Sequence, residues 1–371
     1  MDPSGLAIAG FSRNTDSAYS FRIRKLAEGL EENAVRCDLF FMSDNKPLDT
    51  QTTASLFMPW WLPVLRQYDF VYCGAPMVGQ ALYFSRMFVP GLIILDMHGD
   101  DVSQSAQANE LRSGEKRRSA SLRVRIAYGM AMSSADYWLT QSMLQMEDLI
   151  AAGVAKERVS VVRNGVDLKL FRCLPQPKEP EFKFGYAGGF HVWQGINEFV
   201  EAFDRLGDPS VRMLMVGFRE SDGPLKKALR QRFGSRVELA DMVSQESMVE
   251  LFKSVAILVS ARPGHIASRA AFPTKFAEYA ALGRPILVND VDETAHFVRK
   301  YKCGFVSDPC PAKLAETMYQ ASQVPWDKLV EMGTNARRMA EQNFSWEQVG
   351  QDYAALIRGI TSRFGRTRRR W

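Results

Sequence analysis

Short apolar runs alternate with segments of helical apolar spacing along the whole chain, and this alternation restricts the possible folds more than any other feature. In residues 91–97 the run GLIILDM is almost entirely apolar, as expected of a parallel strand that is buried on both faces. Similar short runs occupy residues 5–11, 35–42, 69–73, 135–140, 159–162, 183–187, 212–217, 237–239, 256–260 and 286–288. Strands that alternate with helices predict doubly wound α/β sheets.

A proline-rich segment separates the alternating pattern into two halves. CLPQPKEPEF, which begins at Cys173, holds three prolines in ten residues and is typical of a linker. A chain of 371 residues also suits two domains better than one. We therefore predict an N-terminal domain over residues 1–172, a second domain over 173–345, and a helix with a basic tail over 346–371.

Several protein classes are disfavoured by composition. No apolar run approaches the roughly 20 residues needed to span a bilayer, and the first residues lack the order of a signal peptide. The five cysteines are scattered without metal-binding spacing, so we expect no zinc site and no disulfide framework. These features favour a cytoplasmic globular protein.

Positive charge is concentrated in two segments. Six cations and one acid lie between Arg112 and Arg125, and five arginines without an acid lie between Arg363 and Arg370. Such clusters attract phosphates, so an anionic membrane surface is one candidate partner, while a solvated helix face and a frayed tail explain them equally well. No nucleic-acid binding motif accompanies the charge, and we expect no nucleic-acid partner.

The stretch FPTKFAEYAALGRPILVND, residues 272–290, predicts a short helix, a tight turn and a buried strand. Pro273 suits the first helical turn, because its missing N–H is one that a helix start leaves unpaired. Gly283 follows the last residue of helical spacing, where a left-handed cap is expected. The apolar run after it then enters the sheet.

The start of this predicted helix has the features of an anion site. Backbone N–H groups from Phe272 to Thr274, together with Pro273 in the same turn, lie at the positive end of the helix dipole. Lys275 adds a cation, and Glu278 adds a carboxylate one turn later. A phosphate and a hydroxyl-bearing sugar fit side by side at such a place.

Other candidate residues follow the predicted strands. His98 comes directly after the strand of residues 91–97, at the edge where open α/β sheets bind ligands. Gly188 and Gly189 form a turn whose missing side chains let a ligand approach the backbone. A loop before the predicted helix contributes Arg262, His265 and Arg269.

Together these segments resemble the group 1 retaining glycosyltransferases of the GT-B fold, in which two Rossmann-like domains face a cleft. The resemblance covers nearly the whole chain. It is strongest at VVRNGVDLKLF, residues 161–171, at the turn of Gly188 and Gly189, and at Phe344-Ser-Trp-Glu, which is similar to the start of the helix that crosses back to the first domain.

Two positions depart from the pattern of that family. Its signature has two glutamates separated by seven residues and a glycine five residues after the second. Glu278 and Gly283 match, but Ala270 stands where the first glutamate is usual. The family also places an Arg in the glycine turn and a Lys before the next helix, where this chain has Gly189-Phe190 and Gln194.

The resemblance implies sugar transfer from a nucleotide diphosphate sugar to a hydroxyl acceptor, with retained anomeric configuration and no metal or other cofactor. Glu278 would hold the ribose hydroxyls, and His98 matches the histidine that the family presents to sugar and acceptor. We assign the neutralisation of the diphosphate to Arg269 and Lys275 and to the amides from Phe272 to Thr274.

Three alternatives stay open. A nucleotide-sugar epimerase or a phosphorylase of the same fold would bind similar ligands. A degenerate transferase that only binds or regulates is favoured by Ala270 and Gln194. A dinucleotide-dependent oxidoreductase has little support, because no GxGxxG follows the first strand.

Overall fold

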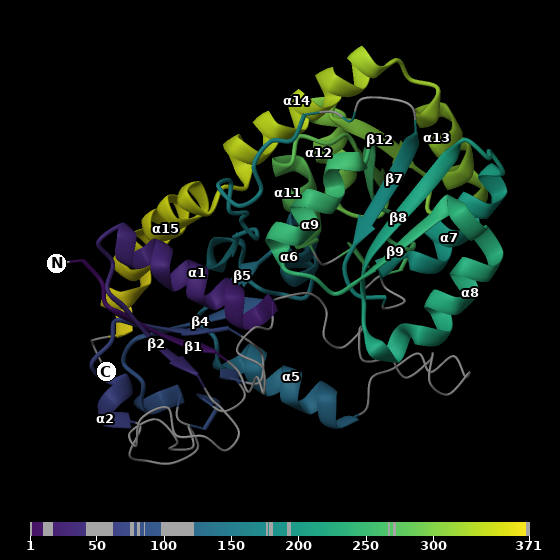
Figure 1. Cartoon of the computed structure of the whole chain (residues 1–371). Helices are drawn as coiled ribbons and strands as arrows, with labels where there is room; N and C mark the ends of the chain where they lie inside the picture. Colours follow the sequence, from purple (N-terminus) through teal and green to yellow (C-terminus); the bar gives the residue numbers. More distant parts are fainter. Residues whose placement is uncertain are drawn as a thin grey trace. The chain divides into compact units, whose positions relative to one another are not determined.

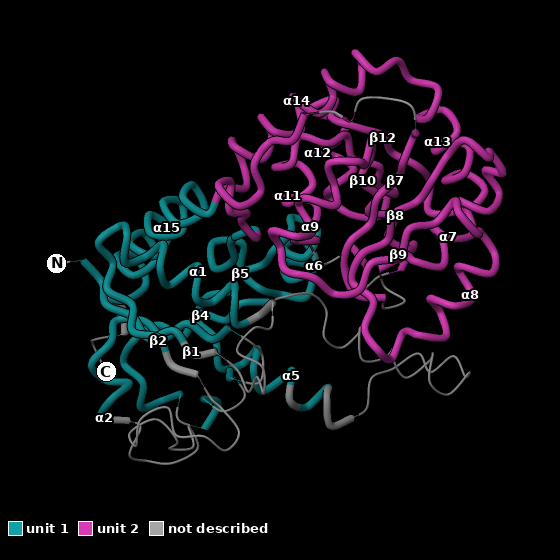
Figure 2. The backbone as a smooth tube through the Cα atoms, viewed as in Figure 1, with its two compact units in different colours: residues 1–163, 346–371 teal, residues 164–345 magenta. Residues whose placement is uncertain are grey.

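The chain forms two compact units, each built around its own sheet (Figure 1, Figure 2). Unit 1 comprises residues 1–163 and 346–371, and unit 2 comprises residues 164–345. The structure is a computed structural model that describes residues 2–9, 18–41, 62–74, 78–79, 82–84, 86–97, 122–175, 177, 181–190, 194–265, 268–269 and 272–368.

The first unit ends at Arg163 rather than at the expected residue 172. The reason is that Val166, Phe171 and Leu174 are buried in the apolar core of unit 2. The amide of Val166 also donates a hydrogen bond of 2.6 Å to the carbonyl of Phe344. Because these apolar side chains are buried there, residues 164–172 belong to unit 2 and not to the predicted first domain.

Unit 1 contains a parallel sheet of six strands in the order β2-β1-β3-β4-β5-β6. Its strands are β1 (Gly5–Ala9), β2 (Cys37–Phe41), β3 (Phe70–Cys73), β4 (Leu92–Met97), β5 (Tyr137–Thr140) and β6 (Val159–Val161). Its helices are α1 (Ala18–Glu32), α2 (Leu62–Leu65), α5 (Leu122–Ser134), α6 (Met143–Ala151) and α15 (Trp346–Arg368), with 3₁₀ turns η2 (Arg86–Phe88) and η3 (Lys156–Arg158). Helices α1 and α15 pack together, with Cα of Gly350 only 2.7 Å from the Cβ position that a side chain at Gly29 would occupy.

Unit 2 contains a second parallel sheet of six strands, in the order β12-β11-β10-β7-β8-β9. Its strands are β7 (Phe182–Ala187), β8 (Val211–Phe218), β9 (Val237–Asp241), β10 (Ile257–Ser260), β11 (Ile286–Asn289) and β12 (Gly304–Ser307). Its helices are α7 (Ile196–Leu206), α8 (Gly223–Phe233), α9 (Gln245–Leu251), α11 (Thr274–Ala281), α12 (Glu293–Tyr301), α13 (Pro311–Ser322) and α14 (Trp326–Asn343), with 3₁₀ turns η5 (Glu220–Asp222), η6 (Gly234–Arg236) and η7 (Phe252–Ser254).

Alternate residues of the strands in unit 2 divide between two apolar cores, one on each face of the sheet. Phe184 and Met213 pack with α7, α8 and α13. Leu214 and Leu258 pack on the other face with α9, α11, α12 and α14. This double coverage is the doubly wound arrangement that the alternation predicts.

The prediction missed four consecutive elements of unit 2. The strand β12 and the helices α12, α13 and α14 have no counterpart in the predicted pattern. At the C-terminus, α15 begins at Trp346 as predicted and continues to Arg368, so the helix includes part of the predicted basic tail. Among the described helices, none combines the length and the apolar character required to cross a bilayer.

Candidate functional site

The candidate site lies at the carboxyl ends of β7 and β10 in unit 2. From β7 the chain proceeds to β8 on one side, whereas β10 lies on the other side of β7 (Figure 1). The connections therefore diverge between these two strands. In open α/β sheets this switch point leaves a crevice where ligands bind.

A glycine turn follows β7 at this point. Gly188 has φ +136° and donates its amide to the carbonyl of Val216 at 3.1 Å. A Cβ at Gly217 would lie 2.7 Å from the carbonyl oxygen of Gly188, so both glycines allow β7 and β8 to approach closely. Because the amide of Gly188 is already paired, Gly189 is the residue of this turn whose N–H can meet a ligand.

Helix α11 begins on the other side of the switch point. Pro273 is its N-cap rather than a residue of its first turn, and no side chain caps the helix. The amides of Thr274 and Lys275 donate to no described residue, so they are available at the positive end of the helix dipole. Asn164 contributes from the NGVD segment by donating to the hydroxyl of Thr274 at 3.3 Å.

Lys275 extends from α11 to the end of β7. Its Nζ lies 2.9 Å from the hydroxyl of Tyr186, 2.7 Å from Oε1 of Gln194, and 4.2 Å from the centre of the Tyr186 ring. Burial and, to a smaller extent, nearby Arg262 lower the pKa of Lys275 to about 7, and Glu278 acts in the opposite direction. The amine therefore changes its charge near neutral pH.

Glu278 lies one turn after Lys275 on the same helix. Its half-buried carboxylate accepts no hydrogen bond from the described residues. Burial raises the pKa of Glu278 to about 7, against the opposing effect of the Lys275 ammonium. A carboxylate without partners that has lost part of its hydration is suited to accept hydrogen bonds from ligand hydroxyls.

Phe272 does not offer its ring to a ligand. The side chain is 2% exposed and packs against the rings of Phe276, Phe297 and Phe344. Its role in the site is to fix the start of α11 against the core. Only the backbone of this predicted binding residue can contact a ligand.

The arginines of the loop before α11 have different surroundings. Arg262 is buried and pairs with Asp292 at 3.2 Å, and it also donates to the carbonyl of Ser268 at 2.9 Å. It holds the loop in place instead of facing a ligand. Arg269 is exposed, and His265 is half-buried. His98 and Ala270 lie outside the described residues.

Three contributors to the site were not predicted. Tyr186 and Gln194 hold Lys275, and Tyr279 bonds the end of β7. Tyr186 directly precedes Ala187 and the glycine turn, so its position was a signal that the prediction did not use. The Lys275 to Gln194 bond joins residues that are 81 positions apart, and nothing local indicates it.

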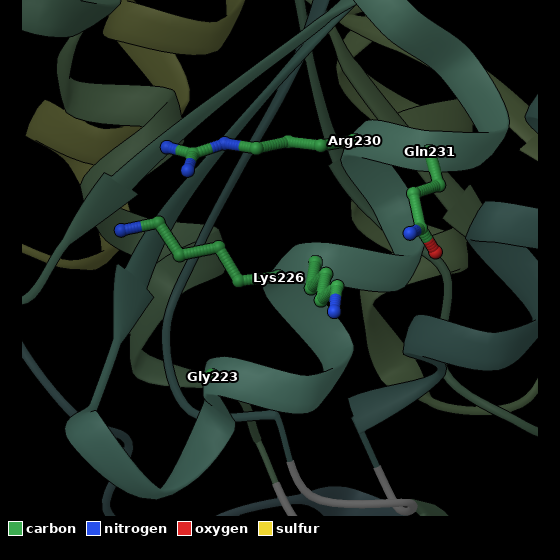
Figure 3. A pocket seen from close by; sticks show the side chains of 5 residues that line it. Gly223, Lys226, Arg230 and Gln231 are labelled. Carbon is green, nitrogen blue, oxygen red and sulfur yellow. The ribbon is translucent and has the colours of Figure 1, made fainter.

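A hollow lies along α8. It is shallow and lined by Gly223, Lys226, Lys227, Arg230 and Gln231, and the side chains of Lys226 and Arg230 extend to the same side (Figure 3). Lys226 also pairs with Asp241 at 2.5 Å. The hollow is formed by one exposed helix face and lacks convergent buried groups, so we place the site at the switch point.

A family model matches the part of the chain that contains these residues. Residues 181–323 match the model described as Glycosyl transferases group 1, and the match includes both the glycine turn and α11. The resemblance to group 1 glycosyltransferases is confirmed.

Among the described residues, no group of three or more His, Cys, Asp and Glu side chains is placed to hold a metal ion.

A relative of known activity is similar over part of the chain. The MMP alpha-(1->4)-mannosyltransferase of Mycolicibacterium hassiacum is 26% identical over 233 residues, which cover 61% of this chain and 54% of that protein. The alignment thus spans about half the length of this curated relative.

Solved structures match nearly the whole chain. Sucrose-phosphate synthase from Thermosynechococcus elongatus has a TM-score of 0.74 at 17% identity, with 98% of this chain and 100% of that chain covered. Anabaena HepE in complex with UDP and glucose has a TM-score of 0.69 at 16% identity, with 96% and 99% covered. At these identities the likeness concerns the fold, and the predicted GT-B class with two doubly wound domains is confirmed.

Proposed function

We propose that the protein is a retaining glycosyltransferase that moves a sugar from a nucleotide diphosphate sugar to a hydroxyl acceptor. The observation that carries this proposal is the placement of Lys275 and Glu278 three residues apart on α11, at the switch point of the second sheet. Residues at this spacing are neighbours on a helix surface. One offers charge to a diphosphate, and the other accepts hydrogen bonds from ribose hydroxyls.

The relatives support a nucleotide diphosphate as the leaving group. Anabaena HepE was solved in complex with UDP-glucose, and the relative from Mycolicibacterium hassiacum is named as a mannosyltransferase. We therefore propose a hexose as the transferred sugar.

The proposed chemistry breaks the bond between the anomeric carbon and the diphosphate oxygen, whose electron pair leaves with the diphosphate. The acceptor hydroxyl oxygen forms the new bond from the same face, and its proton passes to the departing diphosphate. Lys275, Arg269 and the amides of Thr274 and Lys275 would stabilise the negative charge that grows there. Because these groups supply positive charge themselves, we propose that turnover needs no divalent metal.

His98 is a further candidate residue, and in the sequence it directly follows β4. We propose that its imidazole faces the transferred sugar and the acceptor, as the family resemblance implies.

A thermal-shift panel with UDP, GDP, ADP, TDP and CDP tests donor binding, because a ligand of the folded state raises the melting temperature. Each nucleotide is measured with EDTA and with magnesium. We expect one base to shift the melting temperature equally under both conditions. Glu278→Ala should remove this shift while Glu316→Ala, an exposed glutamate on α13, should keep it. A shift that survives in Glu278→Ala would contradict the site.

Turnover separates the proposed transferase from its alternatives. The matching nucleotide sugar is incubated with and without candidate acceptors, and the products are identified by NMR. A new glycoside with the donor's anomeric configuration supports the proposal. A changed sugar without an acceptor indicates an epimerase. Nucleotide binding without any product indicates the binding protein that Ala270 and Gln194 favour.

We also propose that the protein docks on an anionic membrane surface, as a peripheral protein of the cytoplasmic side. The support is charge: the segments from Arg112 to Arg125 and from Arg363 to Arg370 carry a net +10, against +5 for the whole chain. Sedimentation with anionic and neutral vesicles tests the proposal. Equal binding to both kinds of vesicle would contradict it.

A further inference from the structure

The ammonium of Lys275 is held between two side chains of the glycine turn region. It donates to Oε1 of Gln194 at 2.7 Å and to the hydroxyl of Tyr186 at 2.9 Å. The Tyr186 hydroxyl in turn donates to the carbonyl of Gly189 at 2.8 Å, so its oxygen is free to accept from Lys275. Lys275 is thereby tied to the end of β7, although it belongs to α11.

The chemistry of these donors fixes the orientation of the Gln194 amide. An ammonium group has three donors and no acceptor, so the atom of Gln194 that faces it must be the oxygen. The amide Nε2 then points elsewhere, and it donates to no described residue. The third N–H of the ammonium is likewise without a partner among the described residues.

Nε2 of Gln194 and the third N–H of the Lys275 ammonium, which have no acceptor among the described residues, thus lie beside the glycine turn. A side chain at Gly188 would lie 3.1 Å from Nζ of Lys275, so the missing Cβ leaves the ammonium accessible from this turn. The amides at the start of α11 lie on the same helix turn as Lys275. Charged and neutral N–H donors that converge in this way are suited to the oxygens of a diphosphate.

We propose that Gln194 is a positioning residue whose Oε1 fixes the ammonium of Lys275 over the glycine turn, while its Nε2 donates to the same diphosphate. In this arrangement Lys275 of α11 supplies the positive charge that the family resemblance leads one to expect from a lysine at residue 194. This inference rests on the proposed function for the identity of the ligand. Its geometry needs Gln194 and Lys275 together.

Inorganic pyrophosphate is the probe, because it tests the anion site without recognition of a base or ribose. Its affinity is measured by calorimetry between pH 5.5 and 9 for the wild type, Lys275→Gln, Gln194→Ala and Gln194→Glu. Gln231→Ala on exposed α8 is the control. We expect Lys275→Gln to weaken binding roughly tenfold or more, as the loss of a charge-assisted contact implies.

The pH profile separates positioning from a merely structural role. Removal of the acceptor in Gln194→Ala should move the midpoint of the affinity profile to lower pH, because the protonated amine loses a partner. The isosteric Gln194→Glu should move the midpoint to higher pH, because a carboxylate favours the ammonium. The swap Gln194→Lys with Lys275→Gln should recover most of the affinity that Lys275→Gln loses.

The outcomes distinguish this inference from the proposed function. Lys275-dependent pyrophosphate binding with shifted midpoints, in a protein that binds no nucleotide, supports the inference and overturns the proposed function. Nucleotide binding with midpoints that the Gln194 variants leave unchanged overturns the inference alone. A wild type that binds neither probe overturns both.

Discussion

The hydroxyl of Tyr279 forms the hydrogen bonds to the backbone of Ala187 that a neighbouring strand would otherwise form. It accepts a hydrogen bond from the amide of Ala187 at 2.8 Å and lies 3.2 Å from the carbonyl of the same residue. Pairing of β7 with β10 has ended at Gly185, so the backbone of Ala187 has no neighbouring strand on this side. Tyr279 therefore joins α11 to β7 at the switch point.

Tyr279→Phe should lower the free energy of unfolding by about 2 kcal/mol, because two buried backbone groups lose their partner. Urea denaturation measures this change. Tyr319→Phe on α13, where the ring is 54% exposed, is the matched control and should have little effect. Equal stability of Tyr279→Phe and the wild type would show that the hydroxyl does not carry this contact.

The charge of Glu278 predicts a pH-dependent stability. Burial raises its pKa in the folded state to about 7, so folding favours the protonated form. This contribution is fully present below the unfolded pKa of about 4.5 and is lost as the pH rises through 7. Glu278→Gln should thus be more stable than the wild type at pH 8, by on the order of 1–2 kcal/mol.

At pH 4.5 this stability difference between Glu278→Gln and the wild type should disappear. Denaturation at a series of pH values gives the result directly. Lys275 works in the opposite direction, since its lowered pKa adds stability as the pH rises from about 7 toward 10.5. A difference that stays constant over the whole series would mean that Glu278 is not perturbed by burial.

Gly195 joins the glycine turn to α7 and cannot accept a side chain. It has φ +74°, and a Cβ there would lie 1.6 Å from the carbonyl oxygen of Ala261. Gly195→Ala should destabilise unit 2 by about 3 kcal/mol, because the backbone after β10 must move. Gly207→Ala is the control: its φ is +65°, but the nearest atom is 3.8 Å away, so only the backbone cost of about 1 kcal/mol is expected.

Urea denaturation of both glycine variants separates steric overlap from backbone strain. If Gly195→Ala and Gly207→Ala lose the same stability, the close approach of Ala261 to Gly195 is not rigid.

A buried ion pair holds unit 1 together. Arg22 of α1 donates to Asp96 of β4 at 2.8 Å and to the carbonyl of Val162 at 2.7 Å, and both charged side chains are at most 2% exposed. Asp96→Asn should cost about 3–5 kcal/mol, because the guanidinium stays buried without a counter-charge. Arg36→Ala removes an exposed pair with Asp38 and should cost less than about 1 kcal/mol.

Thermal and urea denaturation of these two variants check the contrast between buried and exposed pairs. A small loss for Asp96→Asn would indicate that water reaches Arg22 in the folded protein.

Most strands of both sheets could be predicted from the sequence. A strand that is buried on both faces has apolar side chains at successive positions, and such a run is visible in the local sequence. The helix and strand around Gly283 were predicted for the same reason, and its φ of +67° confirms the left-handed turn. The elements from α12 to α14 were missed. In α14 three of the five buried residues are Gly333, Ala336 and Ala340, whose small side chains give little apolar signal in the sequence.

Residue types and local periodicity were determined by the sequence alone. They include the spacing of Lys275 and Glu278, the glycine turn and the succession of strands and helices within each half. The tertiary structure decided which partners these groups have and which charge they carry. The partners of Lys275 are 81 and 89 positions away, and its pKa depends on burial that exists only once α11 packs against β7. Burial and long-range hydrogen bonds arise only in the folded chain, and for this reason local sequence did not reveal the contact between Gln194 and Lys275.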